Sequence, residues 1–107
     1  MSERMEKVNK LVKELTANFL NRESTSASLI SVTDVSVSPD MKKAKILISV
    51  LPSNQEKTAL LFAKRKLGEM RDYLKQNMET KHIPFLEVDI DKGEKNRQKI
   101  DELLREK

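Results

Sequence analysis

Residues 29–51, LISVTDVSVSPDMKKAKILISVL, decide the fold of this chain. β-Branched residues dominate the first half, and in the second half Ala44, Ile46, Ile48 and Val50 alternate with Lys45, Leu47 and Ser49, which is the pattern of half-buried strands. Between the halves, Ser38-Pro39-Asp40 signals a turn, because proline fixes its own φ and aspartate can bond the nearby backbone. The stretch therefore predicts two antiparallel strands, 29–37 and 44–50.

The first of these strands changes phase near Thr33-Asp34. Ile30 and Val32 share one face of a regular strand, whereas Val35 and Val37 share the other, because the side-chain period of a strand is two. The pattern predicts a bulge or a bend at this point.

Helices are predicted on both sides of the hairpin. Residues 3–21 carry apolar side chains at the three-four spacing that gathers them on one stripe: Met5, Val8, Val12, Leu15 and Phe19. Residues 55–79 are helical in composition, but their apolar positions fall on two faces with Gly68 between them. A glycine inside a helix costs about 1 kcal/mol relative to alanine. We therefore predict two short helices, a kinked pair that meets near Gly68, at about residues 66–68.

A third strand is predicted over 85–90, where Leu86, Val88 and Ile90 share one face. A last helix over 94–106 follows, carried by Ile100, Leu103 and Leu104. The order α-β-β-α-α-β predicts an α+β fold with helices packed on one face of a three-stranded sheet. With 107 residues, we expect a single domain over 1–107 and a peripheral C-terminal helix over 93–107.

The residue types that catalysis and cofactor sites need are scarce. The chain has no cysteine, and His82 is its only histidine, with no obvious nucleophile to serve. Two glycines cannot build a phosphate-binding loop. The best candidate for a metal site is an acidic cluster: Glu87, Asp89, Asp91 and Glu94. The solvated outer face of a strand gives the same pattern. We expect no enzyme activity, no cofactor, no metal and no small-molecule substrate.

The chain also lacks the features of exported and membrane proteins. Its longest apolar run is 59–63, and its N-terminus is charged from Glu3 onward. We expect a soluble, cytoplasmic monomer that does not enter a membrane.

Basic residues gather in the middle of the chain. Between Met41 and Lys75 there are nine basic and three acidic residues, whereas the region from Leu86 onward is nearly neutral. This distribution indicates one positive face, as in proteins that bind polyanions. A lysine-rich solvated surface gives the same pattern, so this alternative stays open here.

The candidate RNA-binding residues centre on the predicted helix junction. Three consecutive basic residues precede the glycine, and two more follow within the second helix: Lys64, Arg65, Lys66, Gly68, Arg71 and Lys75. Weaker candidates, chosen from charge alone, are Arg4, Lys7, Lys42 and Lys43. All three phenylalanines, Phe19, Phe62 and Phe85, are expected in the core, so base stacking on the sheet is not expected. Contacts should instead reach phosphates and fix position more than base identity.

Several of these segments resemble the ribosome-binding factor A family. Residues 32–46, VTDVSVSPDMKKAKI, look like the family signature VTDVxVSPDLxxAKV. Downstream, Gly68-Glu-Met-Arg71 matches a glycine-x-x-arginine helix start, and residues 84–89 resemble PxLxFxxD. Residues 100–104, IDELL, look like the closing IxxLL. Together these segments cover nearly the whole chain.

The resemblance implies a type II KH-like domain in which an alanine-x-glycine helix kink replaces the usual glycine-x-x-glycine loop. Here Lys66-Leu67-Gly68 stands in that place. It further implies binding to free small ribosomal subunits and their ribosomal RNA during late maturation, and often a role in cold adaptation. The alternative is a basic protein–protein adaptor that does not bind RNA.

Overall fold

The computed structural model describes residues 3–23, 29–79 and 82–93, and the predicted C-terminal helix over 94–106 lies outside them. Helix α1 spans Glu3–Glu23, and strands β1 and β2 span Leu29–Val37 and Lys43–Leu51. A short 3-10 turn, η1, covers Ser53–Gln55. The remaining elements are α2 (Glu56–Arg65), α3 (Leu67–Asn77) and β3 (Phe85–Ile90). The predicted order α-β-β-α-α-β is confirmed.

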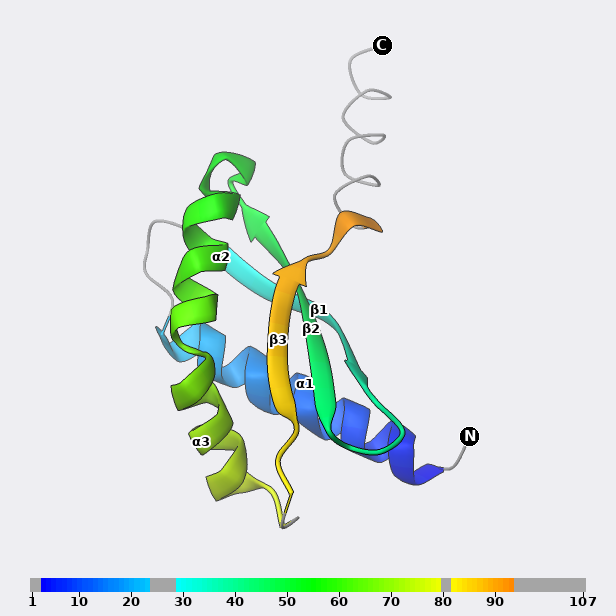
Figure 1. Ribbon diagram of the computed structural model, residues 1–107. Helices are drawn as coiled ribbons and strands as arrows, with labels where there is room; N and C mark the ends of the chain where they lie inside the picture. The colour runs from blue at the N-terminus through cyan, green and yellow to red at the C-terminus, as the bar shows by residue number, and fades with distance from the viewer. Residues whose placement is uncertain (1–2, 24–28, 80–81, 94–107) are drawn as a thin grey trace.

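The three strands form one sheet in the order β1-β2-β3. β2 pairs antiparallel with β1 and parallel with β3. A parallel pair cannot be joined by a tight turn and needs a crossover connection. The α2–α3 pair supplies this crossover and lies alongside β3, whereas α1 crosses behind the sheet (Figure 1).

The predicted irregularity in β1 is a β-bulge at Thr33. Val32 pairs with Ile48 and Asp34 pairs with Leu47, so Thr33 has no partner of its own in the ladder. Its hydroxyl is 3.2 Å from the Leu47 carbonyl oxygen and 2.6 Å from Oδ2 of Asp91. The bulge therefore brings the apolar residues on both of its sides to the covered face, and its side chain ties β1 to the end of β3.

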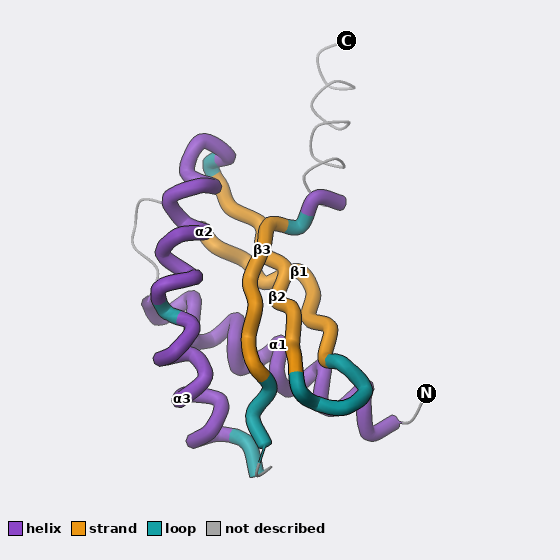
Figure 2. The backbone as a smooth tube through the Cα atoms, viewed as in Figure 1, coloured by secondary structure: helices purple, strands orange, loops and turns teal. Residues whose placement is uncertain are grey.

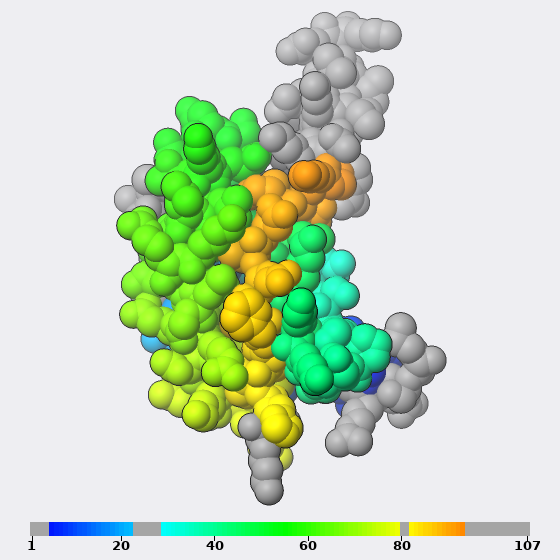
Figure 3. Space-filling view, viewed as in Figure 1, coloured from blue at the N-terminus to red at the C-terminus, as the bar shows by residue number. Residues whose placement is uncertain are grey.

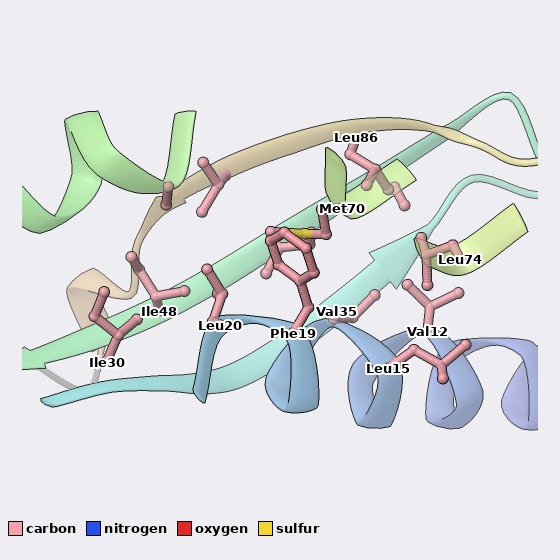
Figure 4. Close-up of a cluster of buried hydrophobic side chains, with 14 of the residues drawn as sticks. Val12, Leu15, Phe19, Leu20, Ile30, Val35, Ile48, Met70, Leu74 and Leu86 are labelled. Carbon is pink, nitrogen blue, oxygen red and sulfur yellow. The ribbon is translucent and has the colours of Figure 1, made fainter. Parts of the chain in front are cut away.

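The core lies between the sheet and the helices (Figure 4). Helix α1 supplies Val12, Phe19 and Leu20, and α3 supplies Met70 and Leu74, all of them buried. From the sheet, the alternate residues of β2 are buried: Ala44, Ile46, Ile48 and Val50. Residues between them on β2 are exposed or half-buried. Among the residues that the structure describes, the helices therefore cover one face of the sheet, as predicted.

Two polar side chains of α1 serve the packing rather than a site. Thr16 is fully buried, and its hydroxyl is satisfied by the Val12 carbonyl oxygen at 2.8 Å. Asn9 Oδ1 accepts a hydrogen bond of 2.9 Å from the Val37 backbone N–H at the end of β1. The Thr16 bond stays within α1, whereas the Asn9 bond fixes the helix to the end of β1.

The turn between β1 and β2 is held by Asp40. Its Oδ1 accepts hydrogen bonds from the Ser38 hydroxyl at 2.6 Å and from the Lys42 backbone N–H at 3.1 Å. Met41, which lies between Asp40 and Lys42, has a left-handed φ of 63°, which is costly for a residue with a side chain. The carboxylate bonds help to hold the turn in that conformation.

We expect this turn to weaken in acid. The Ser38 hydroxyl bond, followed by the Lys42 N–H bond, holds the pKa of Asp40 below its ordinary value of 3.8. A carboxyl whose pKa is lowered by folding stabilises the fold above its unfolded pKa, and this contribution is lost as the pH falls through the folded pKa. Asp40→Ala should therefore lower the free energy of unfolding at pH 7, and its deficit should shrink below pH 3.8.

Urea unfolding followed by circular dichroism at several pH values measures this difference. Asp40→Asn is the matched control, because it keeps an acceptor oxygen but loses the charge; it should be less destabilised at pH 7. An equal deficit for Asp40→Ala at neutral and acid pH would contradict the assignment.

Candidate nucleic-acid interface

The predicted helix junction is a break of one residue. α2 ends at Arg65, α3 begins at Leu67, and Lys66 between them has φ −91° and ψ 0°. The backbone hydrogen bonds continue across it: Lys66 N–H bonds the Phe62 and Ala63 carbonyls, both at 3.1 Å, and Met70 N–H bonds the Lys66 carbonyl at 2.8 Å. The two helices therefore meet as a kink, visible as the short loop segment between α2 and α3 in Figure 2.

Gly68 lies inside the first turn of α3 rather than at the break. None of the glycines in the described ranges has a positive φ, and a Cβ added to Gly68 would meet nothing within 4 Å. The fold of the chain alone therefore does not require glycine here. The missing side chain instead leaves the helix backbone open to close approach by a bound molecule.

A shallow hollow surrounds the kink and brings four of the predicted residues together. Arg65, Lys66, Gly68 and Arg71 line it, together with Phe62, Glu69 and Asp72. The N-terminus of α3 also lies at this junction, and the N-terminus of a helix favours an anion. Lys64 is exposed beside the kink, and Lys75 is exposed one turn beyond Arg71.

Lys66 has contacts within the chain that moderate its charge. Its Nζ lies 3.0 Å from Glu69 Oε2 and 5.9 Å from the centre of the Phe62 ring. These contacts orient the ammonium group along the kink. Lys66 therefore contributes less free positive charge to the hollow than its type suggests, and the exposed residues Lys64 and Arg65 contribute more.

Arg71 is anchored to the segment that leads into β3. Its Nη2 donates a hydrogen bond of 3.2 Å to the carbonyl oxygen of Ile83. A guanidinium group has five N–H donors, so most of them are left for a phosphate. The sequence predicted a phosphate contact for Arg71 but not this hydrogen bond. Arg71 and Ile83 meet only because the chain crosses over to β3.

The weaker candidates lie away from the kink. Lys42 and Lys43 are exposed at the β1–β2 turn and the start of β2, and Lys7 is exposed on α1. Arg4 lies in α1, but its side chain is outside the described residues. Of these four, Lys42 lines a groove that also contains Arg71.

This second groove, about 920 Å³ in volume, lies between α1, the β1–β2 turn and the segment before β3. Its lining is mainly apolar and includes Leu11, Met41 and Phe85. Phe85 is 64% exposed, so the prediction that all three phenylalanines belong to the core was wrong for this residue. The alternation along β3 contained the signal, because Leu86 and Val88 are the buried residues and Phe85 has the opposite phase.

The described residues contain no group of three or more histidines, aspartates or glutamates that could hold a metal ion. In the acidic row of β3, Asp91 accepts the Thr33 hydroxyl and Asp89 accepts the Ile90 backbone N–H at 2.8 Å. His82 is exposed in the segment before β3. None of the helices in these ranges is long and apolar enough to cross a membrane.

Gly68 gives a test of the kink hollow. Gly68→Ala should raise the stability of the isolated protein, by up to about 1 kcal/mol, because alanine is the better helix former and its Cβ meets nothing. If the kink hollow binds RNA, as the sequence predicts, the same variant should bind it more weakly, because the methyl group occupies the space needed for close approach. Thermal unfolding and RNA affinity, measured on the same sample, test both expectations. A stabilised variant with unchanged RNA affinity would exclude close approach at Gly68.

The comparisons with known proteins all point to the same family. A family profile described as ribosome-binding factor A matches residues 4–104. Ribosome-binding factor A of Coxiella burnetii (strain Dugway 5J108-111) is 32% identical over 106 residues, which cover 97% of this chain and 89% of the relative.

Solved structures with the same description have the same fold. The crystal structure of ribosome-binding factor A from Thermus thermophilus superimposes with a TM-score of 0.72 at 17% identity, covering 80% of this chain and 94% of that one. A homology model of the Thermus thermophilus protein, fitted into a cryo-electron microscopy map of its complex with 30S, gives a TM-score of 0.68 at 18% identity. The match covers 76% of this chain and 88% of that one.

Proposed function

The chain belongs to the ribosome-binding factor A family, and on this premise we propose that it binds free small ribosomal subunits through their ribosomal RNA. In this role it assists the late processing and folding of that RNA in the cytoplasm, as a monomer and without chemistry of its own. Support of subunit maturation in the cold belongs to the same proposal.

One observation carries the proposal: the kink between α2 and α3 gathers basic side chains around an open stretch of helix backbone. Arg65, Lys66 and Arg71 line the same hollow as Gly68. Phosphate contacts of this kind supply affinity and orientation without reading base sequence. The fitted Thermus thermophilus protein, described as part of a 30S complex, adds support from a structure with the same fold.

A protein that only binds can still direct maturation. If it binds one conformation of the immature subunit more tightly than another, it shifts the population toward that conformation by the difference in binding free energy. The geometry suits this role, because the kink is held by backbone hydrogen bonds and by the Lys66–Glu69 ion pair. The hollow is therefore largely formed before any partner binds.

Charge reversal beside the kink tests the proposal. We expect Lys64→Glu with Arg65→Glu to weaken binding to free small subunits at least about tenfold at low salt. The slope of log affinity against log salt should also fall by about one for each lost phosphate contact. Lys66 is left unchanged, because a glutamate there would face Glu69 instead of pairing with it. Sedimentation of purified subunits with the labelled protein measures both quantities.

Lys10→Glu with Lys13→Glu is the matched control, since it makes the same change in net charge at exposed positions of α1. It should keep nearly normal affinity, and circular dichroism should show both variants folded. Equal losses of affinity in the two double variants would mean that net charge, and not the kink, drives binding. Wild-type binding that is insensitive to salt and survives nuclease treatment would favour the protein–protein adaptor.

A further inference from the structure

Phe85 stands out on the uncovered face of the sheet. It begins β3 in phase opposite to the buried Leu86 and Val88, and 64% of it is exposed. Its backbone is fixed, because Phe85 N–H donates a hydrogen bond of 2.8 Å to the Lys42 carbonyl oxygen. In Figure 3, β3 and the adjoining part of β2 are not covered by helices. A large aromatic ring is thus held by the sheet but shielded by little of the chain.

Basic side chains surround this ring. Lys43 pairs with Phe85 across the parallel ladder, so the two side chains are neighbours on the same face. Lys42 and Arg71 line the groove that Phe85 borders. The acidic residues of β3 begin one pair further along, where Glu87 faces Lys45. Asp40 and Glu79 also line this groove and offset part of the positive charge that Lys42, Lys43 and Arg71 place near Phe85.

We propose that Phe85, with Lys42 and Lys43, forms a second RNA contact on which one unpaired base stacks while the lysines hold the adjoining phosphates. This inference rests on the proposed RNA-binding function. It extends that function from backbone contacts at the kink to unpaired RNA on the sheet.

The chemistry selects unpaired RNA over other partners. Bases in a duplex have their faces covered by their neighbours, whereas an unpaired base can place its face on an aromatic ring. An apolar peptide could also contact Phe85 and the neighbouring groove. The three cations at Lys42, Lys43 and Arg71, however, complement a polyanion better than an apolar chain.

The two contacts are joined through Arg71. Its side chain lines both the kink hollow and the groove beside Phe85. It also bonds the carbonyl of Ile83, two residues before Phe85. A single strand that leaves the kink at Arg71 can therefore continue along this groove, where Lys42 is the next basic residue, and reach Phe85. This arrangement predicts a preference for RNA in which a single-stranded segment adjoins the bound backbone.

Substitutions at Phe85 separate stacking from apolar contact. Phe85→Tyr keeps the ring, whereas Phe85→Leu keeps apolar bulk without it. Fluorescence anisotropy should be measured with a labelled single-stranded RNA and with its duplex. We expect Phe85→Leu to weaken single-strand binding by about 5- to 150-fold, as the loss of one stacked base does, and to leave duplex binding unchanged. Phe85→Tyr should bind like the wild type. Leu61→Ala on α2, a residue that is 55% exposed, is the control and should bind normally.

Other outcomes would overturn the proposed RNA contact at Phe85. They also distinguish the failure of this contact from the failure of the proposed function. Unchanged single-strand binding by Phe85→Leu would reject the proposed stacking at Phe85. If the Lys64/Arg65 reversal still weakens subunit binding, the proposed function stands. A loss of affinity for whole subunits without any loss for naked RNA would assign Phe85 to a protein contact. A wild-type protein that binds neither RNA nor subunits would overturn both proposals.

Discussion

Lys43–Ile48 of β2 pair in parallel with Phe85–Ile90 of β3, and nearly every other feature depends on this pairing. A parallel pair needs a crossover long enough to return the chain to the same end of the sheet. Here the crossover is the α2–α3 pair, which therefore lies beside β3, a strand at the edge of the sheet (Figure 1). The inward face of β2 is buried in one core with residues of all three helices. Within the described part of the chain, the opposite face of the sheet is left uncovered.

The two candidate RNA contacts follow from this architecture. At the kink, a one-residue break at Lys66 opens the backbone near Gly68 without interrupting the hydrogen bonds on either side. On the uncovered face, the start of β3 places Phe85 next to the basic end of β2. Arg71 lies between them and is bonded to the segment that leads into β3. In the proposed function, recognition of this kind provides orientation and a preference for one RNA conformation.

Much of the fold was predictable because its signals are local. The phase change at Thr33-Asp34 predicted an irregularity, and the structure has a bulge there. The two apolar faces of 55–79 predicted a helix break, which occurs at Lys66. The basic cluster was also identifiable from the sequence. The contact of Arg71 within the chain was not. The ion pair of Lys66 with Glu69 is a local pair of residues three positions apart, whereas the bond from Arg71 to Ile83 joins residues brought together only by the crossover.

The sequence by itself determined the elements, the family resemblance and the basic cluster, because periodicity, turn residues and charge are properties of short stretches of chain. Only the tertiary structure decided which faces those elements expose. The same hydrophobic character that places Phe19 in the core leaves Phe85 on the surface, because burial depends on which face of the sheet the helices cover. That choice is made by contacts between distant segments, and these contacts determine where the two proposed RNA contacts lie.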